Sequence, residues 1–109
     1  MTNYLFIEAR DPFASRDTEF LERTAIALKQ RGHGVTVFLV QNGVLAVREN
    51  GPDAYLSRLA AAGVTLLADD FSLCERGIPA TESHPSIKPA GMGTLVDALL
   101  EENTRAIWH

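Results

Sequence analysis

The chain has 109 residues, a length that fits one domain rather than two. Hydrophobic residues make up 46% of it, and its formal net charge is -4, with no cluster of lysine and arginine. This composition excludes a disordered chain and gives no support to binding of nucleic acid or of anionic membranes. We therefore expect a single folded domain over residues 1–109.

The cysteine content and the hydropathy pattern predict a cytoplasmic protein. With Cys74 as its one cysteine, the chain cannot form an internal disulfide, which suits a reducing compartment. The first residues lack the positive segment that begins a signal peptide, and they are typical of a strand instead. No apolar run approaches the ~18 residues that a membrane-spanning helix needs.

Apolar runs alternate with helical patterns along the chain. The sequence predicts strands at 4–7, 35–40, 64–68 and 105–108, helices around 20–28, 55–60 and 94–100, and short helical segments at 44–48 and 69–77. The long stretch from Ile78 to Gly93 contains proline and glycine, and we expect a short strand in it at Ile78 or at Ile87. Such alternation predicts a three-layer α/β/α fold with a mainly parallel sheet of about five strands.

Polar side chains follow the first three predicted strands at their carboxyl ends. In open parallel sheets, ligands bind beyond these ends. The residues concerned are Glu8, Arg10, Asn42, Asp69, Asp70 and Ser72. We expect them to line a pocket for a neutral or mixed-charge ligand, or for a loop of a partner protein, with residues 78–93 as its lid.

The acidic residues at the strand ends allow two interpretations. Asp69 and Asp70, together with Glu8 and Asp11, could hold Mg²⁺. Alternatively, Asp69 or Asp70 caps the helix that follows, which is the interpretation that we favour. The three histidines lack metal-ligand spacing, and neither Gly-x-Gly has the context of a nucleotide fingerprint, so no metal or cofactor is expected.

Cys74 is the candidate nucleophile. If it lies at a helix N-terminus, the helix dipole favours its thiolate, with Arg76 assisting and Glu75 opposing. Alternatively, it is a small half-buried apolar residue that does not react. The residues alone leave both interpretations open.

Several stretches, taken in their order, resemble the DsrE-like (DsrE/DsrF/DsrH-type) family of small sulfur-relay proteins. They are residues 4–7, the strand and turn at 37–44, the segment 68–78 with its Arg-Gly-Ile, and Gly91 to Leu95. The resemblance covers almost the whole chain. It implies an α/β/α fold, a homo-oligomer that is a trimer or a hexamer, and a persulfide-carrying cysteine after the third strand.

The chain departs from the family at this cysteine. The resemblance places the family's cysteine at the position of Asp69, whereas Cys74 comes five residues later. Five residues of helix rotate a side chain by roughly 140°, so Cys74 is expected to face away from the usual pocket. The resemblance thus implies either a persulfide carrier through Cys74 or a non-catalytic subunit that assists a sulfur-relay partner protein.

Two further expectations concern association. A short segment contains three apolar residues close together, Val44, Leu45 and Val47. We expect a thin domain to leave them partly exposed, so that they form the contact between the copies of an oligomer. A function of a different class also fits the residues, namely a non-enzymatic oligomeric module that binds a ligand or a protein in the acidic strand-end pocket.

Overall fold

The computed structural model describes residues 2–13, 17–49, 51–79 and 83–109. Its elements in chain order are β1 (Asn3–Glu8), α1 (Thr18–Gln30), β2 (Gly34–Leu39), the 3-10 helix η1 (Gln41–Arg48), α2 (Tyr55–Ala61), β3 (Thr65–Asp69), α3 (Asp70–Glu75), β4 (Ile87–Ala90), α4 (Met92–Leu100) and β5 (Thr104–Trp108). The strand inside the long 78–93 stretch therefore lies at Ile87 and not at Ile78. No helix of the described ranges is long and apolar enough to cross a membrane.

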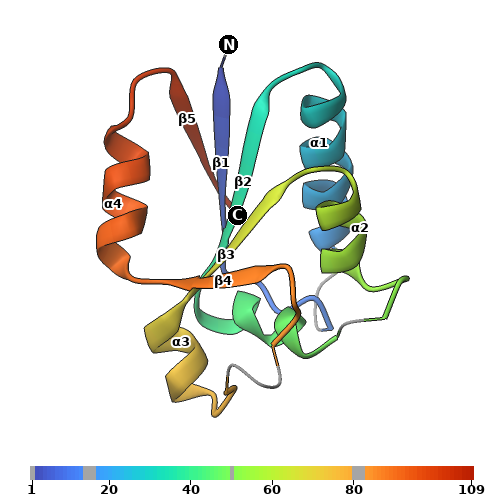
Figure 1. Cartoon of the computed structure of the whole chain (residues 1–109), viewed down its shortest axis with the longest axis vertical. Coiled ribbons are helices and arrows are strands. Elements are labelled where there is room, and N and C mark those ends of the chain that lie inside the picture. The colour runs from blue at the N-terminus through green and yellow to red at the C-terminus, as the bar shows by residue number, and fades with distance from the viewer. Residues whose placement is uncertain (1, 14–16, 50, 80–82) are drawn as a thin grey trace.

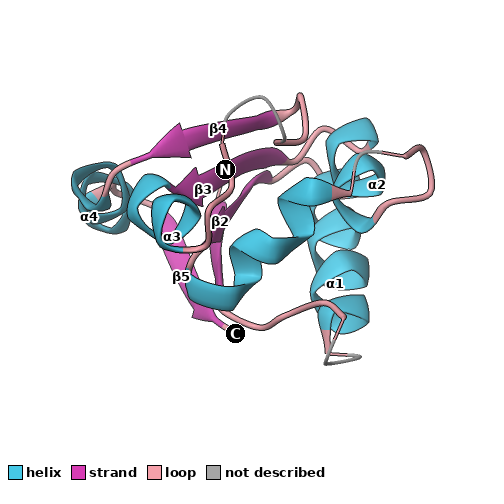
Figure 2. Cartoon of the chain, turned by 90° about the horizontal axis from the view of Figure 1, so that it is seen from below, coloured by secondary structure: helices cyan, strands magenta, loops and turns pink. Residues whose placement is uncertain are grey.

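All the strand pairs are parallel, in the order β4-β3-β2-β1-β5 (Figure 1). Helices α1 and α2 cover one face of the sheet, and α4 covers the other (Figure 2). The α4 crossover carries the chain from one edge strand, β4, to the opposite edge, β5. These features confirm the predicted three-layer fold and its parallel five-stranded sheet.

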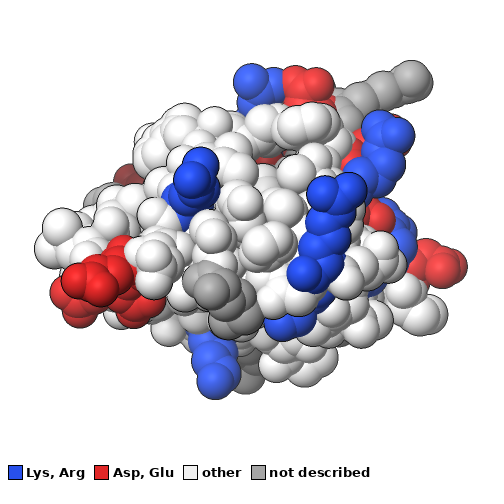
Figure 3. All heavy atoms as spheres, turned by 90° about the horizontal axis from the view of Figure 1, so that it is seen from above, with Lys and Arg blue, Asp and Glu red and all other residues white. Residues whose placement is uncertain are grey.

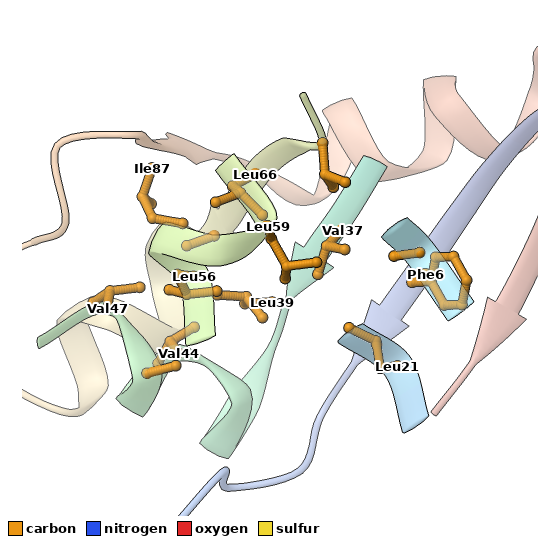
Figure 4. Packing of buried hydrophobic residues seen from close by; sticks show 14 of the residues in the cluster. Phe6, Leu21, Val37, Leu39, Val44, Val47, Leu56, Leu59, Leu66 and Ile87 are labelled. Carbon is orange, nitrogen blue, oxygen red and sulfur yellow. The ribbon is translucent and has the colours of Figure 1, made fainter. Parts of the chain in front are cut away.

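The larger hydrophobic core lies between the sheet and the helices α1, η1 and α2 (Figure 4). Alternate residues of β2, namely Val35, Val37 and Leu39, point into it and are buried. Leu21 of α1 and Leu59 of α2 pack onto this face and have no exposed surface. The period of two along the strand thus places one set of side chains under the two helices.

The opposite face of the sheet carries a smaller core beneath one helix, α4. Its buried members are Leu5, Ile7, Phe38, Val40 and Leu95. The side of α4 that faces away from the sheet also carries apolar residues, and these are exposed to solvent. Met92, Val96, Leu99 and Leu100 of α4 are between 42% and 78% exposed.

The expected exposure of the 44–47 segment is wrong for two of its three residues. Val44 and Val47 are completely buried, and Leu45 is half-buried against the main core. The reason is that η1 packs between α2 and α3 and turns these side chains inward. Four of the large exposed apolar side chains among the described residues lie on α4 instead.

Gly43 lies in the first turn of η1, where the chain passes close to the backbone of β1. A Cβ atom at this position would overlap the backbone carbonyl oxygen of Glu8. We expect Gly43→Ala to lower the free energy of unfolding by about 1–3 kcal/mol, because the backbone of β1 or of η1 has to move. Urea unfolding measures the change. Gly51→Ala is the control, since nothing lies within 4 Å of a Cβ there, and equal effects of the two substitutions would contradict the prediction.

Candidate functional site

The carboxyl ends of the strands lie together at the lower side of Figure 1, beside η1 and α3. The predicted site residues are all at this edge of the sheet. They do not form one open pocket, however. They divide into a Glu8 group, an Asp69–Ser72 group, an Asn42 contact and an apolar cleft that contains Asp70 and Cys74.

Glu8 is buried and already has its hydrogen-bond partners. Its Oε1 accepts the backbone N–H of Arg10 at 2.8 Å, and its Oε2 lies 2.5 Å from Nδ1 of His109. Only 1% of Glu8 is exposed. The Arg10 side chain is exposed and forms an ion pair with Asp17. Sequence reasoning missed His109, since nothing in the sequence shows that β5 lies beside β1.

Asp69 is the N-cap of α3, as the capping interpretation predicted. Its Oδ2 accepts the backbone N–H of Ser72 at 3.1 Å and the Ser72 hydroxyl at 2.6 Å. The backbone N–H of Gln41 in turn donates to Ser72 Oγ at 2.9 Å. Gln41 has a left-handed conformation, with φ of 49°, which is uncommon for a non-glycine residue. Asp69 and Ser72 are both buried, so this chain of hydrogen bonds ties the end of β3 to the end of β2.

Asn42 is exposed and forms hydrogen bonds with Arg76, the C-cap residue of α3. Its Oδ1 accepts from Nε of Arg76 at 3.2 Å and from Nη2 at 3.1 Å. Nη1 of Arg76 lies 3.7 Å from the Glu75 carboxylate. The guanidinium group that was expected to assist Cys74 is therefore occupied by Asn42 and Glu75.

A cleft of about 570 Å³ opens between α3, the segment after it and β4. It is lined mainly by apolar side chains. The lining residues are Asp70, Leu73, Cys74, Gly77, Ile78, Pro79, Ser83 and Pro89. Residues on both sides of 80–82 thus form one wall, while 80–82 themselves, part of the expected lid, lie outside the described residues.

The position of Cys74 differs from both sequence-based interpretations. Cys74 is exposed, so it is not a half-buried core residue. It is also the fifth of the six residues of α3, so it does not lie at a helix N-terminus. The helix N-terminus, where the dipole was expected to assist Cys74, is occupied by Asp69 and Asp70 instead.

His84 forms a serine–histidine pair that cannot act as nucleophile and base. Its Nε2 lies 2.8 Å from Ser57 Oγ, and its Nδ1 accepts the backbone N–H of Ser86 at 3.0 Å. Since Nδ1 accepts, the proton of the neutral ring is on Nε2, and the ring donates to the serine instead of taking its proton. The pair fastens the 83–86 segment to α2.

The acidic residues are not gathered into a metal site. Glu8 is on β1 and Asp69 on β3, with β2 between them, and each carboxylate has the partners given above. Within the described ranges, no group of three or more His, Cys, Asp or Glu side chains could hold a metal ion. For these carboxylates to line a ligand pocket, the hydrogen bonds of Glu8 and of Asp69 described above would have to break.

The comparisons with known proteins agree with this architecture. The structure is similar to that of the ychN protein from E. coli, with a TM-score of 0.86 at 19% sequence identity over 100% of both chains. It is also similar to MTH1491, a protein of unknown function from Methanobacterium thermoautotrophicum, with a TM-score of 0.79 at 18% identity over 100% of both chains. For BT1422, a conserved protein of unknown function from Bacteroides thetaiotaomicron, the TM-score is 0.78 at 18% identity, over 98% of this chain and 94% of the other.

At the level of sequence, the comparison with curated proteins gives no match. The model of the DsrE/DsrF-like family, in contrast, matches residues 3–107, which is nearly the whole chain. The α/β/α fold is the one that the resemblance implied. The chain therefore belongs to the DsrE/DsrF-like family.

Proposed function

We propose that this protein is a non-catalytic subunit of a sulfur relay. The observation that supports the proposal is the Asp69 carboxylate, which stands where the resemblance places the family's sulfur-carrying cysteine. The N–H and O–H groups of Ser72 both donate to Asp69 Oδ2. Donors of this kind would hold an anionic sulfur if a cysteine were present. In this chain they hold the side chain of Asp69 instead.

A subunit of this kind acts by binding other proteins. We propose that it is cytoplasmic, that it forms a homo-oligomer, a trimer or a hexamer, and that it assists a sulfur-relay partner protein. The cleft beside α3 supports partner binding, because Leu73, Ile78 and Pro89 offer an apolar surface on its walls. A loop of the partner that carries an apolar side chain fits this surface.

A second candidate function is persulfide transfer through Cys74, and the exposure of its thiol on the wall of the cleft favours it. In this reaction the Cys74 thiolate attacks the outer, sulfane sulfur of a donor persulfide. The S–S bond of the donor breaks, the donor leaves as a thiolate, and Cys74 becomes the persulfide. One sulfur atom moves and no external oxidant or reductant is needed.

One experiment separates the two candidates. The folded protein is incubated with a low-molecular-weight persulfide, treated briefly with a mild thiol, and weighed intact by mass spectrometry. Under the first proposal, the wild type keeps its mass, and Asp69→Cys in a Cys74→Ser background gains one sulfur atom. Asp69→Ser in the same background is the matched control and gains none.

The outcomes are distinct. Sulfur uptake by the wild type that Cys74→Ser abolishes would replace the first proposal with the second. If the Asp69→Cys variant folds, as shown by circular dichroism, and stays unmodified, then the carboxylate does not stand at a sulfur-binding position and the first proposal fails.

A further inference from the structure

The outer surface of α4 combines apolar and acidic side chains. Val96 and Leu100, four residues apart, are 48% and 78% exposed. Asp97 lies beside them on α4, and Glu101 is the C-cap residue that directly follows the helix. Neither carboxylate has a hydrogen bond or an ion pair with any other described residue. We call these four residues the acidic α4 surface.

The outer surface of α1 has a groove of the opposite charge, with a volume of about 500 Å³. Its lining residues are Phe20, Arg23, Thr24, Ala27, Leu28 and Arg31, and we call it the basic α1 groove. Phe20 is 57% exposed. The side chains of Arg23 and Arg31 have no partner among the described residues, whereas the nearby Glu22 is already neutralised by Arg58 at 2.8 Å.

These two surfaces match in chemistry and in spacing. In the groove, Arg23, Ala27 and Arg31 form a row with steps of four residues, and Phe20, Thr24 and Leu28 form the adjacent row. Rows of this kind are the ridges and grooves through which helices pack. The two arginines beside the apolar row of α1 therefore complement Asp97 and Glu101, which lie beside Val96 and Leu100 at the C-terminal end of α4.

The two surfaces cannot meet within one copy of the chain. Helices α1 and α4 cover opposite faces of the sheet (Figure 2). Seen from above, acidic atoms cluster at the left, the side of α4, while lysine and arginine side chains are spread from left of the centre to the right edge, where acidic atoms lie among them (Figure 3). The acidic α4 surface can therefore meet the basic α1 groove only on another molecule. Such a head-to-tail contact generates a closed ring when the rotation from each copy to the next adds up to a full turn.

We propose that α4 of one copy docks into the basic α1 groove of the next copy, and that repetition of this contact closes the homo-oligomer into a ring. The inference rests on the homo-oligomer proposed above and gives it an interface. A second copy is the occupant because the charges and apolar rows of both surfaces belong to the same chain. Docking buries the exposed apolar residues of α4 and pairs four charged side chains that have no partner among the residues that the structure describes.

Charge reversal tests the contact by its effect on molecular mass. The groove variant is Arg23→Glu with Arg31→Glu, and the helix variant is Asp97→Lys with Glu101→Lys. We expect light scattering to give a multiple of 11.9 kDa for the wild type and 11.9 kDa for each double variant at micromolar concentration. A chain that carries all four substitutions is complementary to itself again, and we expect it to regain the mass of the wild type.

The control is Lys88→Glu, a reversal at an exposed residue of β4 that belongs to neither surface. We expect it to leave the mass unchanged. An oligomeric wild type whose mass neither double variant lowers would overturn the α1–α4 contact and leave the proposed oligomer intact. Dissociation of both double variants without recovery in the fourfold variant would overturn it as well. A monomeric wild type would refute the oligomer itself.

Discussion

Replacing Phe38 with alanine should lower the free energy of unfolding by about 3–5 kcal/mol. Phe38 lies in the central strand β2, has no exposed surface, and is the largest side chain of the small core that holds α4 on the sheet. Because one helix covers this face, little can move in to fill the cavity. The loss is a large part of the about 5–15 kcal/mol that stabilises a typical domain. Urea unfolding followed by circular dichroism measures it.

Phe71→Ala is the matched control for this prediction. The same side chain is deleted, but Phe71 is 67% exposed on α3, so we expect a change within about 0.5 kcal/mol. A loss below about 1 kcal/mol for Phe38→Ala would mean that α4 is not anchored through this core. In that case the surface that α4 offers to a second copy would not be fixed in place.

The second large effect is expected at high pH and comes from Tyr55. Its hydroxyl is buried and has no hydrogen-bond partner among the described residues. Burial, with smaller contributions from the charges of Glu8 and Glu22, raises the pKa of Tyr55 far above its usual value. The folded state therefore holds the neutral phenol, while the unfolded chain ionises near pH 10. Above about pH 10 the stability should fall by about 1.4 kcal/mol per pH unit.

Tyr55→Phe removes this dependence on pH. Below pH 10 we expect the variant to be more stable than the wild type by about 1–2 kcal/mol, because an unpaired hydroxyl no longer has to be buried. The difference should widen as the pH rises toward 11. Tyr4→Phe is the control, since the Tyr4 hydroxyl is not among the buried polar atoms that lack a partner in the described residues. Parallel pH curves for wild type and Tyr55→Phe would show that the hydroxyl reaches water or a partner in solution.

The order of the elements and the parallel sheet could be predicted from the sequence because they depend on local patterns. The run from Val35 to Val40 is apolar without interruption, which indicates a strand covered on both faces, and β2 is the central strand of the sheet. Capping of α3 by Asp69 or Asp70 could also be predicted, because both aspartates stand just before a short helical pattern, and the structure shows that Asp69 is the cap. In each case the residues that decide the structure are neighbours in the chain.

The parts that could not be predicted depend on contacts between distant segments. His109 meets Glu8 only because β5 pairs with β1. The burial of Val44 and Val47 depends on η1 packing between α2 and α3. To predict where Cys74 lies in α3, one has to know that the helix starts at Asp70. A helix that started one turn later would have placed Cys74 near its N-terminus instead of its C-terminus.

The strand order also bears on how the protein resists aggregation. A parallel sheet has two edges, and here they are β4 and β5. The β4 edge contains Pro89, which has no N–H to offer to an incoming strand, beside the charged Lys88. Addition of a foreign strand is therefore favoured only along β5. Because a continuous intermolecular sheet needs two open edges on every molecule, a single proline is enough to stop its growth after one step.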